Sequence, residues 1–184
     1  MIRLEYFTNK DYDRLINWVE SARFMMKWGG PGFTFPLTKE QLDEYTEETN
    51  EVGSSRYVYN VVYTKTEEVI GHVSLGKIDY FHGIARVGKV LVSPNARGKG
   101  FTKYVMEEAL TVAFDELNLH RVSLGVFDNN QPAVKAYESF GFVKEGLLRD
   151  ARRFGEEYWD LWEMSLLEDE WRTIQNRRNN NESI

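Results

Sequence analysis

The chain contains no cysteine among its 184 residues. This absence excludes disulfide bonds, thiolate nucleophiles, an acyl-cysteine intermediate and cysteine-ligated metal sites, and we expect no metal site at all. The sequence also has no run of about 18 apolar residues, the length that a membrane-spanning helix needs, and its N-terminus lacks the apolar stretch of a signal peptide. We therefore expect a cytoplasmic protein without a membrane partner.

Positive charge is scarce, since 23 Lys and Arg residues face 29 Asp and Glu residues and the formal net charge is −6. Nucleic-acid phosphates normally bind to a basic surface, so no nucleic-acid partner is expected. An acidic protein would attract a cationic small molecule. The same acidity also serves simply to keep a protein soluble, and the charge alone does not separate these two interpretations.

Length and composition are those of one globular α/β domain, with 42% hydrophobic and 28% charged residues. We expect this domain to cover residues 1–170. A polar tail is expected over residues 171–184, and its last part, from Asn176 onward, is too polar to pack and should fray.

Hydrophobic periodicity predicts strands and helices that alternate along the chain. The predicted strands are residues 2–6, 56–63, 69–75, 87–92, 121–127, 142–143 and 158–167. The predicted helices are residues 11–23, 39–48, 101–117 and 131–140. This order indicates an α/β domain whose ligand lies where a strand leads into a helix.

Local signals mark several ends of these elements. Thr38 and Gln41 resemble a capping box at the start of the second helix. Glycine and proline in residues 27–33 break the first helix, and Pro94 ends a strand because proline cannot donate to a sheet ladder. Gly141 ends the fourth helix.

The loop Arg97-Gly98-Lys99-Gly100-Phe101-Thr102 joins an apolar strand to the longest predicted helix. The first N–H groups of a helix have no partner within the helix and carry the positive end of its dipole, so phosphate oxygens satisfy them. Two glycines let a diphosphate approach the main chain closely, and Arg97 and Lys99 add positive charge. The spacing is that of neither a Walker loop nor a dinucleotide-binding loop. By itself the loop is also compatible with a tight structural turn.

Two motifs make this sequence resemble a known family. The segment from Val92 to Thr102 resembles motif A of the GNAT acetyltransferases, Arg/Gln-x-x-Gly-x-Gly/Ala, with Thr102 in place of the last Gly/Ala. Downstream, Asn130-x-x-Ala133-x-x-x-Tyr137-x-x-x-Gly141-Phe142 resembles motif B. The likeness is close over residues 85–165 and loose elsewhere, and it is strongest to the subgroup of ribosomal-protein alanine and spermidine acetyltransferases.

The resemblance implies the GNAT fold, which is a mixed and mostly antiparallel sheet of six to seven strands with helices on both faces and a splayed strand pair that binds CoA. It implies acetyl-CoA as co-substrate and transfer to an amine by direct attack in a ternary complex. Tyr137 matches the proton donor to the CoA thiolate, a role that suits a phenol with a pKa near 10. The implied cofactor-binding residues are Val90, Leu91, Val92, Arg97, Gly98, Lys99, Gly100, Phe101, Thr102 and Asn130. Asn130 is equally placed to cap the helix that follows it.

The base that deprotonates the amine has no match. Where many relatives carry a glutamate this chain has Arg86, and at a second family position it has Gly125. A water relay, or a residue such as His72, Asp79 or His82, stays open, although a structural role is an alternative for each of the three.

The acceptor site is expected around the aromatic residues Trp28, Phe33 and Phe35 and the loop over residues 79–83, although core packing is an alternative for each aromatic residue. The acceptor is either a small-molecule amine or a peptide N-terminus. The acidic helix over residues 39–51 either favours a polyamine or is a solvated surface. A non-catalytic module that only binds acyl-CoA is the rival function, and a homodimer is left open.

Overall fold

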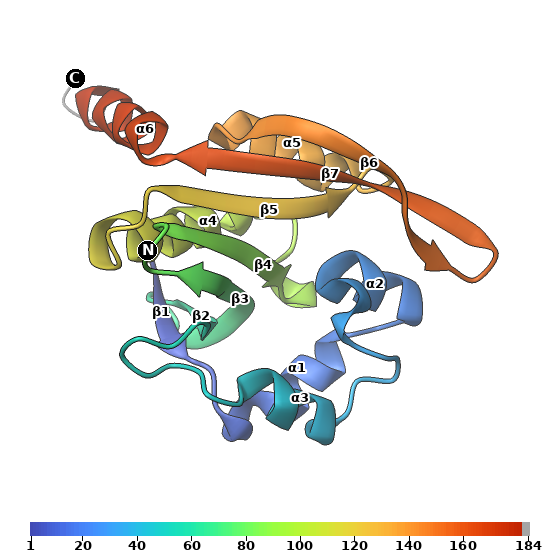
Figure 1. The fold of residues 1–184 in the computed structure, drawn as a ribbon. Helices are drawn as coiled ribbons and strands as arrows, with labels where there is room; N and C mark the ends of the chain where they lie inside the picture. The colour runs from blue at the N-terminus through green and yellow to red at the C-terminus, as the bar shows by residue number, and fades with distance from the viewer. Residues whose placement is uncertain (182–184) are drawn as a thin grey trace.

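A computed structural model, which describes residues 1–181, contains one seven-stranded sheet in the order β1-β2-β3-β4-β5-β7-β6 (Figure 1). The strands are β1 (Ile2–Tyr6), β2 (Tyr57–Tyr63), β3 (Glu68–Asp79), β4 (Ile84–Val92), β5 (Arg121–Phe127), β6 (Val143–Phe154) and β7 (Glu157–Leu167). Neighbouring strands are antiparallel except β4 and β5, which run parallel. The expected mixed, mostly antiparallel sheet is confirmed.

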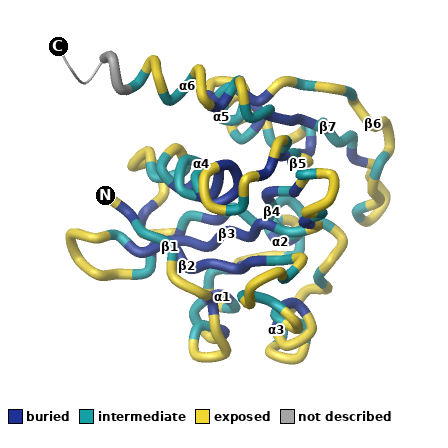
Figure 2. Tube along the Cα trace, turned by 60° about the vertical axis from the view of Figure 1, so that its left-hand side comes forward, coloured by how far each residue is buried: buried dark blue, intermediate teal, exposed yellow. Residues whose placement is uncertain are grey.

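Helices cover both faces of the sheet, as expected. They are α1 (Tyr12–Trp18), α2 (Ala22–Gly29), α3 (Lys39–Thr46), α4 (Phe101–Thr111), α5 (Gln131–Phe140) and α6 (Glu168–Asn181). One hydrophobic cluster joins α1, α2 and α3 to Val58 and Leu91 of the sheet, and a larger one joins α4, α5 and α6 to the opposite face. Successive residues of a strand point to opposite faces, which is why Val58 lies in one cluster and Tyr57 and Tyr59 in the other. Figure 2 shows the buried residues concentrated in the central strands and α4.

The single helix predicted over residues 11–23 is wrong, because the structure divides it into α1 and α2. Val19 is extended, with φ −90° and ψ 93°, and so ends α1. The hydroxyl of Ser21 accepts a hydrogen bond from the N–H of Phe24 and caps a new helix. The helix α2 then continues to Gly29, so the predicted break at residue 27 comes two residues too early. Three helices therefore precede β2, not two.

Where a capping or stop signal is local, the predicted elements are confirmed. The hydroxyl of Thr38 accepts a hydrogen bond from the N–H of Gln41 and opens α3. Residues of β2 and β3 pair as the expected antiparallel hairpin. Gly141 ends α5 with φ 121°, a backbone angle that other residues rarely adopt. The predicted helix over residues 101–117 is α4 extended by a π-helical turn, η4 (Val112–Glu116).

The strand β6 is far longer than the predicted two residues. It spans Val143–Phe154, and its register with β7 shifts between Lys144 and Gly146 and again between Leu148 and Arg152. The β6–β7 hairpin extends beyond the rest of the sheet (Figure 1), and most of β6 is exposed (Figure 2). A strand without a buried face carries no alternation of apolar and polar residues, which explains why the sequence did not predict it.

The expected polar tail is a helix instead. The boundary after residue 170 falls inside α6, which remains helical to Asn181 despite the predicted fraying from Asn176; residues 182–184 lie outside the described residues. Trp171 is completely buried and stacks on Phe114 and Phe140, with ring centroids 6.0 and 6.2 Å apart. One large aromatic side chain, with Ile174, thus holds a mostly polar helix on the core. Within residues 1–181 no helix combines the length and apolar character needed to cross a membrane.

Candidate active site

The strands β4 and β5 part from each other halfway along. They pair over only three positions, Ile84 with Arg121, Ala85 with Val122 and Arg86 with Ser123. Beyond Arg86, β4 continues to Val92 and β5 to Phe127 without pairing to each other. The expected splayed strand pair is confirmed. Main-chain groups on the two facing edges are therefore free to bind an extended ligand.

An ion pair lies at the point where the strands part. The guanidinium of Arg86 donates two hydrogen bonds of 2.7 Å to the carboxylate of Glu163 on β7. Gly125 leaves room for it, because a Cβ atom at this position would lie 2.5 Å from Nη2 of Arg86. The two family positions for a glutamate base thus hold a guanidinium and the glycine that accommodates it. No sequence signal identified Glu163, which lies 77 residues from Arg86.

A cleft of about 390 Å³ opens between the parted strands, α2 and α5. Eight of the residues predicted from the sequence line it: Trp28, Val90, Leu91, Val92, Arg97, Thr102, Asn130 and Tyr137. Lys99 and Phe101 line a separate cavity of about 660 Å³. The structure therefore brings the two ends of the loop, Arg97 and Thr102, to the same cleft as Asn130 and Tyr137.

The loop before α4 has the backbone of an anion site. Gly98 and Gly100 have φ of 76° and 77°, in the left-handed region, and no atom lies within 4 Å of a Cβ placed on either. Gly100 occupies the N-cap position of α4 and no side chain caps the helix. Donors of its first turn are thus open to a ligand. Arg97 donates to the carbonyl of Val92 (3.2 Å) and to Glu20 (2.9 Å).

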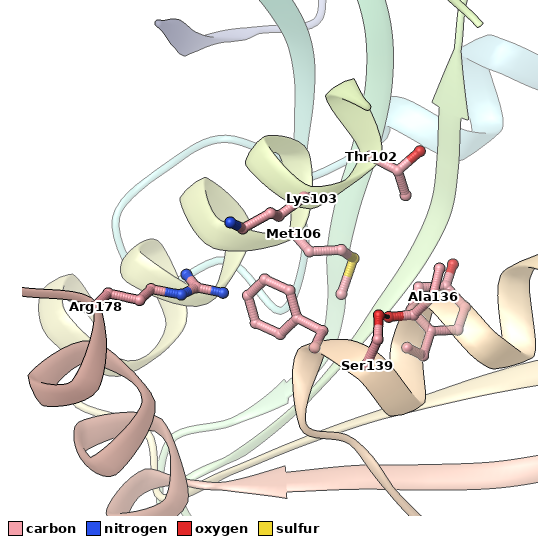
Figure 3. Close-up of a pocket in the computed structure, with 8 residues that line it drawn as sticks. Thr102, Lys103, Met106, Ala136, Ser139 and Arg178 are labelled. Carbon is pink, nitrogen blue, oxygen red and sulfur yellow. Dashed lines mark hydrogen bonds between the residues drawn. The ribbon is translucent and has the colours of Figure 1, made fainter. Parts of the chain in front are cut away.

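Tyr137 lies between two cavities. It lines the cleft and also a cavity of about 120 Å³ that α4, α5 and α6 enclose with residues such as Met106, Ser139 and Arg178 (Figure 3). The ring of Phe142 packs edge-on against it, 6.0 Å between centroids. Burial raises the pKa of Tyr137 to about 12, so the phenol holds its proton at neutral pH.

Asn130 does not act as a side-chain cap. It occupies the N-cap position of α5, but its side chain makes no capping hydrogen bond. Only its carbonyl bonds to the helix, from the N–H groups of Ala133 and Val134. Asn130 is also one of the residues that line the cleft.

The three aromatic residues predicted for the acceptor site do not lie together. Trp28 and Phe33 stack with their ring centroids 5.6 Å apart. Trp28 lines the cleft, whereas Phe33 lines an adjoining cavity of about 570 Å³. Phe35 is 43% exposed and lines neither cavity.

None of the three open candidates for a base lines the cleft. His72 is buried in β3, where its Nε2 lies 3.1 Å from the hydroxyl of Tyr45, and burial lowers its pKa to about 3. Asp79 and His82 form an exposed pair, 2.8 Å apart, beside Ile84 at the start of β4. The loop over residues 79–83 therefore lies at the opposite end of β4 from the cleft.

Lys89 was not predicted as a site residue, yet it lines both the cleft and the adjoining cavity. Its ammonium lies 5.0 Å from the ring centroid of Phe33 and 5.1 Å from that of Tyr45. Burial, together with the charge of Arg56, lowers the pKa of Lys89 to about 8. The signal that could have identified it is a lone charge within the apolar strand over residues 87–92.

Comparison with known proteins matches residues 14–142 to the profile described as "Acetyltransferase (GNAT) family". The chain belongs to this family. A relative, the uncharacterized N-acetyltransferase p20 of Bacillus licheniformis, is 34% identical over 113 residues, 61% of this chain and 63% of p20, slightly less than two thirds of its length. The spermidine N(1)-acetyltransferase of Vibrio cholerae is 32% identical over 133 residues, 72% of this chain and 75% of that enzyme.

The fold agrees with this assignment. The crystal structure of spermidine N-acetyltransferase from Vibrio cholerae in complex with CoA and spermine superposes with a TM-score of 0.80 and 26% identity, over 92% of this chain and 97% of that one. Membership of the GNAT family confirms the expected class of enzyme, an N-acetyltransferase that uses acetyl-CoA. Within residues 1–181, no group of three or more His, Cys, Asp or Glu side chains is placed to hold a metal ion.

Proposed function

We propose that this enzyme transfers the acetyl group of acetyl-CoA to a primary amine by direct attack in a ternary complex. One observation carries the proposal: β4 and β5 part after Arg86, and the cleft between them leads to the uncapped start of α4. Unpaired strand edges suit the extended pantetheine arm, and bare helix N–H groups suit its diphosphate. The cleft reaches Arg97 and Thr102 at the two ends of the loop before α4, so a single long cofactor can make both kinds of contact.

The cofactor contacts follow from this arrangement. The diphosphate binds to main-chain N–H groups from Gly98 to Thr102 and competes with Glu20 for the guanidinium of Arg97. The pantetheine arm pairs with the edge of β4 along Val90, Leu91 and Val92. Its other flank faces the side chain of Asn130, which is not engaged in capping.

The chemistry uses the main chain first. A main-chain N–H group of β4 polarises the thioester carbonyl, and its hydrogen bond strengthens as negative charge develops on that oxygen. Water takes a proton from the acceptor ammonium, and the free amine nitrogen then attacks the carbonyl carbon. As the C–S bond breaks, the nitrogen releases its second proton to water. Tyr137 donates its phenolic proton to the departing thiolate, and solvent reprotonates the phenolate.

The acceptor is an amine of a small molecule, with a peptide N-terminus as a second acceptor class. Relatives named for spermidine support the first class.

For the assembly we propose a homodimer, to be measured by light scattering with and without acetyl-CoA. We place the reaction in the cytoplasm, where acetyl-CoA is made available to enzymes of this kind.

The test is release of free thiol from acetyl-CoA by the purified protein with polyamines, aminoglycosides, amino acids and peptides as acceptors. Mass spectrometry identifies the acetylated product. We expect thiol release that depends on the amine. Binding of acetyl-CoA without turnover on any amine would favour the rival non-catalytic module, and calorimetry that detects no binding of CoA would overturn the proposal.

A further inference from the structure

A second cavity adjoins the cleft and is joined to it by Lys89, which lines both. This cavity has a volume of about 570 Å³ and lies beside Phe33, whose ring stacks on Trp28 of the cleft. Its other lining side chains include Gln41, Glu44, Tyr45 and Arg56. A molecule whose amine reaches the thioester past Lys89 has room for the rest of its structure here.

Two cations face this cavity, Lys89 from β4 and Arg56 from the segment before β2. Arg56 donates one hydrogen bond of 2.8 Å to the carbonyl of Tyr45, and both cations lie over the Tyr45 ring. Among residues 1–181, no carboxylate oxygen comes within 4.0 Å of either cation. Glu44 also lines the cavity, but its side chain is exposed and pairs with neither. The inner part of the cavity is therefore positively charged.

This arrangement disfavours a further positive charge. The lowered pKa of Lys89 has burial as its main cause and Arg56 as its second, which means that the ammonium is poorly compensated where it lies. A bound carboxylate would compensate both cations and accept hydrogen bonds from them. A polyamine would instead bring more positive charge into the same space.

We propose that the acceptor amine carries an acidic group, which binds to Lys89 and Arg56 in this cavity while the amine points into the cleft. The inference deepens the proposed function and rests on it. The shared chemistry is an amine a few bonds away from a carboxylate, and two sources supply it: a free amino acid, or a peptide with an acidic residue at its N-terminus.

The first experiment compares acceptors that differ in charge. Thiol release is measured with butylamine, spermidine, 4-aminobutyrate, aspartate, glutamate and a peptide that begins with aspartate. We expect kcat/KM for at least one acid-bearing amine to exceed that for butylamine at least tenfold, and spermidine to fall below butylamine. The free acids and the peptide distinguish the two sources.

The outcomes separate this inference from the proposed function. Turnover of spermidine that equals or exceeds that of every acid-bearing amine would leave the acetyltransferase function standing and overturn the inference. If none of the amines in the panel supported thiol release, both the inference and the proposed function would be overturned.

The second experiment changes the charge of Lys89. Lys89→Met keeps the length of the side chain and the backbone strain of this position, where φ is 51°. We expect the KM of the best acid-bearing amine to rise at least tenfold, with the KM of butylamine and the affinity for CoA within twofold of the unchanged enzyme. Lys65→Met, in the exposed turn between β2 and β3, removes the same charge elsewhere and is the matched control.

A result of the following kind would decide against an anion site. If Lys89 served as the base, Lys89→Met would lower kcat for every acceptor alike and leave their KM values unchanged. Lys89→Glu is the complementary variant, and we expect it to improve kcat/KM for spermidine. Should either variant fail to fold by circular dichroism, Arg56→Gln takes its place and must raise the same KM; an unchanged KM would overturn the inference.

Discussion

At the scale of the residue, Tyr137 lines the cleft and its ring packs against Phe142. Tyr137→Phe keeps the ring and removes the proposed proton donor, so we expect kcat to fall on the order of 10²-fold, a usual contribution of general acid catalysis. The affinity for acetyl-CoA should stay within twofold. Steady-state kinetics and calorimetry measure the two quantities. Tyr158→Phe, which removes an exposed hydroxyl from the hairpin, is the control, and an unaltered kcat for Tyr137→Phe would remove Tyr137 from the mechanism.

His72 makes the stability of the fold depend on pH. Its pKa is near 6.5 in an unfolded chain and about 3 in the fold, mainly because it is buried, with Lys89 and Arg14 opposing its charge and Asp11 favouring it. Below pH 6.5 the unfolded state thus binds a proton that the folded state does not, and stability is lost as the pH falls. By pH 4 this loss reaches roughly 3 kcal/mol.

His72→Gln tests this pH dependence. The variant starts less stable, since it disturbs the contact with Tyr45, but it should lose less stability between pH 6.5 and pH 4 than the unchanged protein. Urea unfolding at several pH values gives both slopes. Carboxylates contribute equally to both proteins, so equal slopes would show that His72 titrates normally in the fold.

At the scale of the element, Trp171 is the fully buried side chain that holds α6 on the core. Trp171 is completely buried between Phe114 and Phe140, whereas most of the helix surface is polar. Trp171→Ala should lower the free energy of unfolding by about 3 to 5 kcal/mol, the usual loss for a large aromatic core residue. Trp171→Phe should lose clearly less. Chemical denaturation followed by far-UV circular dichroism measures both, and a loss below about 1 kcal/mol for the alanine variant would mean that α6 contributes little to the core.

Elements with a local signal could be predicted from the sequence. The cap at Thr38, the glycine at Gly141 and the proline at Pro94 act on their own neighbours, so the ends of α3, α5 and β4 follow from them. The helix α6 carries no local signal of this kind, because it docks through contact between Trp171 and two residues that are distant in the sequence. The strand β6 also lacks a local signal. Most of its residues are exposed, so its sequence resembles that of a loop, and it is a strand because it pairs with β7.

At the scale of the whole molecule, the part of the candidate site that lies within the two sequence motifs could be predicted. Val90 to Val92, Arg97 and Thr102 reach the same cleft as Asn130 and Tyr137, because the parted strands β4 and β5 lead into α4 and α5. Arg56 could not be predicted, since its place beside Lys89 depends on how β2 and β4 share a sheet. The outward position of Phe35 also follows only from the folded path of its loop.

Because the proposed cofactor site joins β4, β5, α4 and α5, acetyl-CoA should stabilise the whole fold. A ligand that binds only the folded state at a hundred times its Kd adds about 2.7 kcal/mol. For a chain of this length that corresponds to a rise in Tm of about 5 to 10 °C, measured by differential scanning calorimetry. S-acetyl-N-acetylcysteamine carries the thioester without the diphosphate and should give a much smaller rise at the same concentration. Equal shifts from the two compounds would mean that the start of α4 does not bind the diphosphate, whereas the expected difference would measure its contribution.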